Sequence, residues 1–397
     1  MTEDEDPARA IDVPFIAIDR LPAADERAAL IDLRAPVEFD DDHVPGARNV
    51  PLFENQTRSF VGLLYRQFSP EAAFQEGRAA VAERIDELVR DVARAIDWDV
   101  PPEDLQRRVL AMTSGGIERM DRELVTRSTD EVPERPAVFA CARGGLRSRS
   151  VVALMRSLGL DAAVGLEGGY RAWRKMVMEA LASFTPPAHV ISLRGLTGVG
   201  KTLVLREIER VRPGWTLDLE GIAGHRSSLL GMVGLAPVSQ KAFETGLHAR
   251  IEQGFADGVM VVEGESRKVG DVVVPARLWD AMLNATNVEL VAEAGTRVRV
   301  LAEDYLADPG SLPKLREQLA AVAERMEGAP DLAGMLDQGQ VAELVELLLE
   351  RYYDPLYRKS EAGKVYAVTI ATDDVEGAAR AIVRWIETSQ LEADRPA

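Results

Sequence analysis

Residues His189 to Thr202 read HVISLRGLTGVGKT, and this stretch decides the fold of the second half of the chain. The run His189 to Leu193 predicts a buried strand, and Leu203 to Val211 is typical of a helix. Between them, Gly195 to Thr202 matches the phosphate-binding pattern G-x4-G-K-T in the strand–loop–helix context that this motif requires. The stretch therefore predicts a P-loop NTPase-like α/β domain.

The P-loop predicts a diphosphate site. Its backbone amides would surround the phosphates, Lys201 would reach the terminal phosphate, and Thr202 is placed to bind Mg²⁺. The motif does not establish NTP hydrolysis, because any molecule that carries a diphosphate would fit it. The candidate phosphate-binding residues are Gly195, Thr197, Gly198, Val199, Gly200, Lys201 and Thr202.

Polar clusters follow two later strands, which we expect at 215–219 and 259–262. Side chains at the carboxyl ends of parallel strands line the ligand crevice, and a P-loop enzyme needs an acid there to orient Mg²⁺ or water. The alternatives are a turn capped by Asp218 or Ser227 and a strand end with solvated acids. The candidates for this second site are Asp218, Glu220, His225, Arg226, Glu263, Glu265, Ser266 and Arg267.

The first half of the chain carries the one cysteine of 397 residues, in the Cys-x5-Arg-Ser loop Cys141 to Ser148. An apolar run precedes this loop and helix-like residues 146–158 follow it, so its amides would form an anion site at a helix N-terminus. That field would lower the thiol pKa. A lone cysteine is more often a buried apolar residue, but the neighbouring glycines and arginines favour a reactive thiolate. The candidate catalytic residues are Cys141, Arg143, Gly144, Gly145, Arg147 and Ser148.

Strands that alternate with helices predict two α/β domains with parallel sheets. The first spans 10–185 and contains a helical insertion at about 60–130; the second spans 189–388 and contains a helical block at 297–360. The Pro-Pro pair between 185 and 188 is the expected linker. Expected strands lie at 14–18, 28–33, 136–141 and about 162–165, and then at 189–193, 215–219, 259–262, 288–291 and 365–370.

Composition narrows the function classes. A single cysteine fits a reducing cytoplasm, and we expect no signal peptide, no transmembrane helix and no membrane partner. The four histidines lack metal-ligand spacing, so no metal site is expected. The net charge of −18 argues against nucleic acid. Basic residues nevertheless gather after the cysteine, either as a phosphate-backbone site or as a solvated helix surface: Arg171, Arg174 and Lys175.

The first domain resembles a rhodanese domain. Ile31 to Phe39 and His43 to Leu52 are similar to its two N-terminal motifs, and Cys141 matches its persulfide-carrying cysteine. The whole chain resembles the bacterial tRNA 2-selenouridine synthases, which fuse this domain to a P-loop domain. Further marks of that family are Leu166 to Ala172, Asp218 to Gly221, Ser239 to Glu244, Glu263 to Arg267 and Tyr353 to Tyr357.

The resemblance implies a two-step reaction at the wobble uridine in the anticodon region of tRNA. Geranyl diphosphate would geranylate the sulfur of 2-thiouridine, and selenium from selenophosphate, carried by Cys141, would then displace the S-geranyl group. No tightly bound cofactor is expected, with Mg²⁺ a candidate ion, and DNA is not an expected partner. The apolar stretch Leu229, Leu230, Met232, Val233 and Leu235 would house the prenyl chain or form core. Where the family has Asn and Gly around the His-Arg pair, this chain has Gly224 and Ser227.

Two other functions fit parts of the sequence. A Cys-x5-Arg phosphatase uses the same spacing, although Ala140 precedes the nucleophile and no general-acid Asp can be placed. A P-loop ATPase with a non-catalytic rhodanese-like docking module would need the second domain alone. A phosphatase assay with an aryl phosphate tests the first alternative. ATP turnover that does not require Cys141 would favour the second over tRNA modification.

Overall fold

The computed structural model describes residues 10–21, 28–100, 104–226, 230 and 234–391. The chain forms two compact units, Met1–Val177 and Met178–Ala397. The division falls inside helix α7 (Gly169–Ala182), a few residues before the domain limit expected from the sequence. Both units are α/β structures with parallel sheets.

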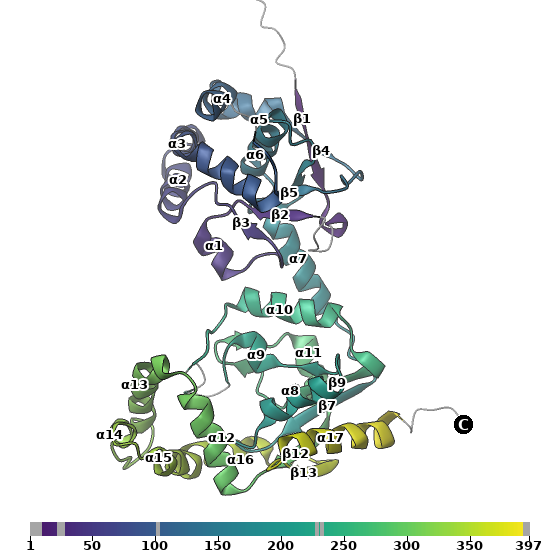
Figure 1. The fold of residues 1–397 in the computed structure, drawn as a ribbon, viewed down its shortest axis with the longest axis vertical. Helices are drawn as coiled ribbons and strands as arrows, with labels where there is room; N and C mark the ends of the chain where they lie inside the picture. The colour runs from purple at the N-terminus through teal and green to yellow at the C-terminus, as the bar shows by residue number, and fades with distance from the viewer. Residues whose placement is uncertain (1–9, 22–27, 101–103, 227–229, 231–233, 392–397) are drawn as a thin grey trace, which may run out of the picture. The chain divides into compact units, whose positions relative to one another are not determined.

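The first unit is built on a six-stranded sheet in the order β3-β2-β5-β6-β1-β4, with all neighbours parallel (Figure 1). Strand β5 lies inside the sheet, and all its residues are buried, as expected for a parallel strand covered on both faces. The strands are β1 (Ile11–Ile16), β2 (Ala29–Asp32), β3 (Arg48–Asn49), β4 (Leu124–Ser128), β5 (Ala137–Ala140) and β6 (Ala163–Leu166).

Four helices fill most of the predicted insertion, and two more follow the strands that carry the sequence motifs. The longest begins at a serine N-cap, where Ser69 accepts a hydrogen bond from the amide of Ala72 and Pro70 occupies the first turn. The helices are α1 (Pro36–Asp41), α2 (Asn55–Gln67), α3 (Pro70–Ile96), α4 (Leu105–Met112), α5 (Gly116–Glu123) and α6 (Leu146–Ser157), with a 3-10 turn at Ile18–Arg20.

The insertion differs from the sequence-based expectation at its end. Residues Leu124–Ser128 form the edge strand β4, which pairs with β1, whereas the prediction placed them in a helical segment. Only Leu124 of this strand is buried, so the sequence lacks the alternation of apolar and polar residues that identifies a strand. Its pairing partner Ile11 is also distant in the chain.

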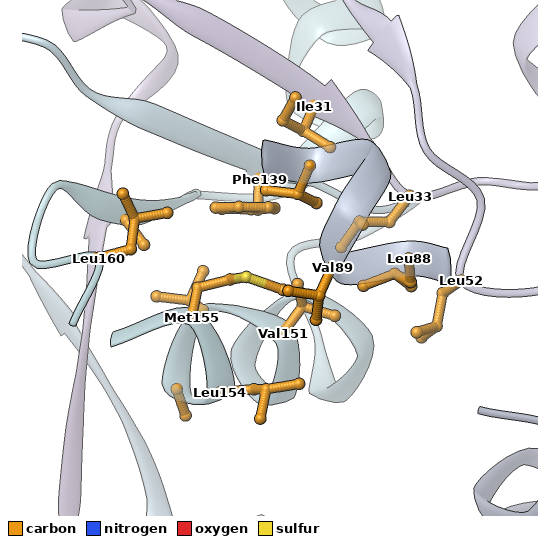
Figure 2. Packing of buried hydrophobic residues seen from close by; sticks show 14 of the residues in the cluster. Ile31, Leu33, Leu52, Leu88, Val89, Phe139, Val151, Leu154, Met155 and Leu160 are labelled. Carbon is orange, nitrogen blue, oxygen red and sulfur yellow. The ribbon is translucent and has the colours of Figure 1, made fainter. Parts of the chain in front are cut away.

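One hydrophobic cluster joins the sheet to α6 and to the insertion (Figure 2). Phe139 of β5 and Ile31 of β2 lie beside Met155 of α6 and Val89 of α3, and none of these side chains is more than 1% exposed. Because α3 shares this core, the insertion is an integral layer of the first unit.

The first N-terminal motif contains a buried ion pair beside the sheet. Arg34 donates to Asp32 at 2.6 Å and to the carbonyl oxygen of Asp42 at 2.7 Å. The guanidinium of Arg34 also lies 3.6 Å from the ring centroid of Tyr170, whose hydroxyl donates to Asp42 at 2.7 Å. These contacts connect the motifs after β2 to the start of α7.

Removal of Arg34 should therefore destabilise the first unit. Arg34→Ala leaves Asp32 buried and unpaired, and we expect a loss of about 3–5 kcal/mol in the free energy of unfolding. Urea denaturation of the full chain measures it. Arg20→Ala is the control, because the Arg20–Asp130 pair is exposed and should change stability by less than about 0.5 kcal/mol. Equal effects of the two substitutions would contradict the structural role of the buried pair.

The second unit is built on a five-stranded parallel sheet in the order β13-β12-β7-β9-β8, with a separate antiparallel hairpin β10-β11. The strand that precedes the P-loop, β7, is central. The strands are β7 (His189–Arg194), β8 (Thr216–Leu217), β9 (Val259–Glu263), β10 (Lys268–Val269), β11 (Val272–Val273), β12 (Thr286–Val291) and β13 (Val368–Ala371).

The predicted helical block forms its own hydrophobic core, in which Tyr353 and Leu319 are almost fully buried. It contains α12 (Ala294–Leu306), α13 (Leu312–Ala323), α14 (Leu332–Asp337), α15 (Val341–Leu348) and α16 (Asp354–Glu361), with a π-helical turn at Leu349–Tyr353. Around the sheet lie α8 (Lys201–Val211), α9 (Leu219–Ala223), α10 (Gln240–Glu252), α11 (Ala276–Leu283) and α17 (Val375–Ile386). In the described part of the chain, every helix is too short or too polar to cross a bilayer.

The expected strand 215–219 is shorter than predicted. It spans Thr216–Leu217, and Leu219 already begins α9. Asp218 ends the strand because its carboxylate caps the helix, accepting from the amide of Gly221 at 2.6 Å. The capped-turn alternative for Asp218 is therefore confirmed.

Candidate functional site

The Cys141 loop is fixed by a second loop. It leaves the end of β5, and α6 begins at Leu146 with Gly145 as its N-cap. The amide of Tyr170 donates to the carbonyl oxygen of Cys141 at 2.9 Å. Gly169 has φ +55°, and a Cβ there would collide with the same carbonyl oxygen. The Leu166–Ala172 motif is thus the support on which the cysteine loop is built.

The surroundings of Cys141 favour its thiolate form. Its side chain is 2% exposed, and Sγ lies 3.2 Å from Oγ of Ser148. Burial by itself raises the pKa of the Cys141 thiol, but the charge of Arg147 and the hydrogen bond of Ser148 oppose it. The backbone amides of Arg143 and Gly145 add to this effect, and the net result is a pKa below the ordinary value. This arrangement favours a nucleophilic Cys141 thiolate that faces the backbone amides of its own loop.

An apolar cavity of about 770 Å³ adjoins the cysteine loop within the first unit. Cys141, Arg143, Gly145 and Arg147 form one part of its wall. Most of the remaining wall comes from the insertion helices and α6, including Phe74, Val81, Ile85, Met112, Met120 and Leu154. The insertion, for which the sequence predicted no functional residue, therefore lines the candidate site.

A carboxylate and a second arginine lie near the charged part of this cavity. Glu38 accepts from Arg58 at 3.0 Å. Burial raises the pKa of Glu38, but the hydrogen bond and charge of Arg58 and the charge of Arg147 lower it below its ordinary value. Glu38 is therefore an ionised, paired acid. Because Arg147 acts on both Glu38 and Cys141, these polar groups form one electrostatic cluster.

The P-loop of the second unit has the geometry expected from its sequence. Gly195 has φ +142°, and a Cβ there would collide with the carbonyl oxygen of Leu290 on β12. Gly200 is the N-cap of α8, and Lys201 and Thr202 begin that helix. Nζ of Lys201 lies 3.3 Å from the carbonyl oxygen of Gly195 and 5.3 Å from the ring centroid of Tyr357.

Distant residues hold this loop in place. Arg297 of α12 donates to the carbonyl oxygen of Thr197 at 2.8 Å and pairs with Asp354 at 2.5 Å. The hydroxyl of Thr372 donates to the carbonyl oxygen of Val199 at 2.7 Å. Sequence reasoning missed Arg297 and Thr372, because only the tertiary structure brings them to the loop.

The predicted acids converge on Lys201 and Thr202. The hydroxyl of Thr202 donates to Glu220 at 2.9 Å, and Nζ of Lys201 lies 4.0 Å from Glu265. Within the described ranges, no group of three or more His, Cys, Asp and Glu side chains is arranged to hold a metal ion. A P-loop Mg²⁺ takes most ligands from phosphate and water, so the hydroxyl of Thr202 with a nearby carboxylate is a fitting set.

Glu263 is a buried acid at the end of β9. Its side chain is inaccessible, and one carboxylate oxygen accepts from the amide of Leu219 at 3.0 Å. The other oxygen has no hydrogen-bond partner among the described residues. Burial, followed by the charges of Asp218 and Glu220, raises the pKa of Glu263 well above its ordinary value. These surroundings favour the protonated form of Glu263.

The remaining second-site candidates contact other parts of the second unit. His225 packs against the hairpin turn at Gly270, and burial lowers its pKa. Arg226 donates to Asp304 of α12 at 2.6 Å. Ser266 donates to the carbonyl oxygen of Lys268, and Arg267 is exposed. Ser227 lies outside the described residues.

The chain also matches known proteins along most of its length. Residues 188–338 match the family model described as the tRNA 2-selenouridine synthase AAA domain. A tRNA 2-selenouridine synthase of Cupriavidus necator is 31% identical over 359 residues, covering 83% of this chain and 87% of that protein. The chain belongs to the tRNA 2-selenouridine synthase family. Synthases of Nitrosomonas europaea and Pseudomonas entomophila are 29% and 27% identical over 79% and 87% of this chain, covering 74% and 91% of their own lengths.

In this member of the synthase family, the expected tRNA surface needs a correction. Arg171 and Lys175 are exposed on α7, but the side chain of Arg174 is only 11% exposed and lies 3.6 Å from Asp42. Arg174 is therefore part of the buried motif cluster and leaves the proposed basic surface. Arg174 follows Arg171 by three residues and directly precedes Lys175, so its position between two exposed cations on an amphipathic helix gave no signal of burial.

The expected prenyl stretch of this family member is largely outside the described residues, which exclude Leu229, Met232 and Val233. Leu230 is buried in the core of the helical block, and Leu235 is 39% exposed. The core alternative therefore holds for Leu230.

We expect the reactivity of Cys141 to depend on its Ser148 hydrogen bond. Ser148→Ala removes a contact that lowers the thiol pKa, so the midpoint of the pH dependence of alkylation by iodoacetamide should rise. Mass spectrometry of the single cysteine follows the reaction. Ser150→Ala is the control, because Ser150 also borders the cavity but donates to the carbonyl oxygens of Leu146 and Arg147. A midpoint unchanged in Ser148→Ala would refute this electrostatic assignment.

Glu263→Gln should flatten the pH dependence of stability. A glutamate whose folded pKa is raised above its unfolded value of about 4.3 contributes stability below that value, which is lost as pH rises through the folded pKa. A neutral glutamine avoids this loss. Unfolding free energies at about pH 5 and pH 8 should therefore differ less in Glu263→Gln than in the unsubstituted protein. Glu376→Gln, on the exposed side of α17, should keep the original dependence.

Proposed function

We propose that this chain converts wobble 2-thiouridine in tRNA to 2-selenouridine, first by geranylation from geranyl diphosphate and then by selenation from selenophosphate. The observation that supports the proposal is that one member of this family carries two loops suited to anions, one in each unit. One surrounds the thiolate-favouring Cys141, and the other is the P-loop at Lys201. One nucleophile and one diphosphate site match the two steps.

The selenation step is assigned to the first unit as a rhodanese-like domain. The phosphate of selenophosphate binds the amides of the Cys141 loop beside Arg147, and the thiolate attacks selenium. An S–Se bond forms as the Se–P bond breaks, and its electron pair leaves with phosphorus as phosphite. The terminal selenium of Cys141 then attacks C2 of the S-geranyl uridine, and geranylthiol leaves. Two equivalents of a small thiol reduce the S–Se bond, restoring Cys141, forming a disulfide and releasing 2-selenouridine.

The geranylation step is assigned to the second unit. The sulfur of 2-thiouridine attacks C1 of geranyl diphosphate, the C–O bond breaks, and its electron pair leaves with diphosphate. The P-loop amides and Lys201 stabilise the charge that develops on this leaving group. Mg²⁺, when bound at Thr202, would supply additional charge on the same phosphates. Glu220 and Glu265 are the acids placed to orient such an ion or its water.

The two rival functions gain less support. A Cys-x5-Arg phosphatase needs a general acid near the thiolate. Among the described residues of the cavity wall, Glu38 supplies the carboxylate, and its pairing with Arg58 keeps it ionised. A P-loop ATPase would leave the activated Cys141 without a role. The proposal therefore includes selenophosphate and geranyl diphosphate as substrates, the tRNA anticodon region as partner, and a cytoplasmic location. Arg171 and Lys175 are the proposed tRNA contacts.

The two steps should separate in two variants. Cys141→Ser should accumulate S-geranyl-2-thiouridine, because the P-loop step is intact and the selenium carrier is lost. Lys201→Ala should slow geranylation roughly ten- to hundred-fold, the cost of about 1.5–3 kcal/mol for a lost charged hydrogen bond. Mass spectrometry of tRNA nucleosides measures both products.

Pre-geranylated tRNA supplies the matched control for each variant. Lys201→Ala should selenate this substrate at close to the rate of the unsubstituted protein, whereas Cys141→Ser should not. Normal 2-selenouridine formation by Cys141→Ser would defeat the proposal. Equal loss of both steps in Lys201→Ala would instead assign the loop to tRNA binding or folding.

A further inference from the structure

The cavity beside Cys141 has the size of a ligand site. It is partly open to solvent, and its volume of about 770 Å³ lies within the range of small-molecule sites. All its walls belong to the first unit. A site of this size next to an activated thiolate indicates a ligand whose reacting atom meets Cys141.

The wall predicts an apolar ligand. Phe74, Val81 and Ile85 of α3 line it together with Met112 of α4 and Met120 of α5. Charged side chains share this wall: Arg147 lowers the pKa of both Cys141 and Glu38, and Arg66 of α2 and Arg78 of α3 also line the cavity. A molecule that fits both parts has an anionic or polar reacting group and a hydrocarbon portion that extends from it.

We propose that this cavity holds the hydrocarbon chain of the S-geranyl group during selenation, and that the insertion helices select its length. This inference rests on the proposed function. When selenium attacks C2, the departing sulfur must lie near Cys141, so the chain attached to that sulfur begins at the cysteine loop. A cavity of roughly 150 Å³ accommodates a six-carbon ring. A ten-carbon chain would therefore fit the larger cavity and leave space for the uracil ring.

The assignment gives the insertion a task distinct from that of the P-loop. The P-loop recognises the diphosphate, which has left before selenation begins. The cavity recognises what remains on the nucleotide, which is a hydrocarbon. The first unit would thereby distinguish the geranylated nucleotide from 2-thiouridine, which has no chain to bury.

The test uses alkylation of Cys141 in the full chain, with free alcohols as probes. Geraniol should slow the reaction with iodoacetamide saturably, because it covers the route to the thiolate. The five-carbon alcohol prenol should need at least about a 100-fold higher concentration, since each buried methylene contributes about four-fold in affinity. Equal protection by the two alcohols, or no protection by geraniol, would overturn the inference.

Substitutions in the cavity wall test where geraniol binds. Val81→Trp and Met112→Trp place an indole in the cavity from different helices, and each should weaken geraniol protection at least about ten-fold. Ala79→Trp is the matched control, because Ala79 is exposed on α3 and outside the cavity wall. Its alkylation and geraniol protection should be unchanged. Because two helices are tested, misfolding of one variant leaves the other to decide, and unchanged protection in a folded wall variant would refute the location.

A second measurement separates this inference from the proposed function. Selenation rates are compared on tRNA anticodon stem-loops that carry S-methyl, S-prenyl or S-geranyl 2-thiouridine. The S-geranyl substrate should react fastest, and Val81→Trp should shift the preference toward the shorter chains. Geraniol protection without selenation of any substrate would support the cavity assignment and reject the proposed function. Selenation that is independent of chain length would reject the cavity assignment alone.

Discussion

The amide of Tyr170 donates to the carbonyl oxygen of Cys141, and this one backbone contact holds the cysteine loop against the start of α7. It requires the close approach that Gly169 permits, and it directs the free amides of the cysteine loop toward the thiolate. The same tyrosine extends its ring under Arg34 and its hydroxyl to Asp42. The cysteine loop and the buried ion pair therefore both contact the same short loop.

In the second unit, side chains hold the P-loop in place. Its P-loop also leaves the end of a central parallel strand, and it is held by Arg297 and Thr372 through the carbonyl oxygens of Thr197 and Val199. Because these donors bind carbonyl oxygens of the loop, they leave its amides available for a phosphate. In both units, the candidate anion loop is held through its carbonyl oxygens.

The sequence predicted what is local. The P-loop, the cysteine loop and the strands β5 and β7 are contiguous signals, so their positions and their order could be predicted. Strand β4, the Arg174–Asp42 pair and the Arg297 support were not, because each depends on a partner far along the chain. The cavity was the feature least accessible to prediction, because its wall combines residues of the insertion with residues of α6. The periodicity of a single helix does not show that several helices line one cavity.

The insertion leaves the sheet after β3 and returns to it as β4, so both of its ends are fixed by strand pairing. A segment anchored in this way can accept changes between its anchors without altering the register of the strand that precedes the cysteine loop. Substitutions that reshape the wall would then be nearly neutral for the cysteine loop. In such an arrangement, substitutions in the insertion can change which ligands the cavity accepts while Cys141 and its loop stay the same.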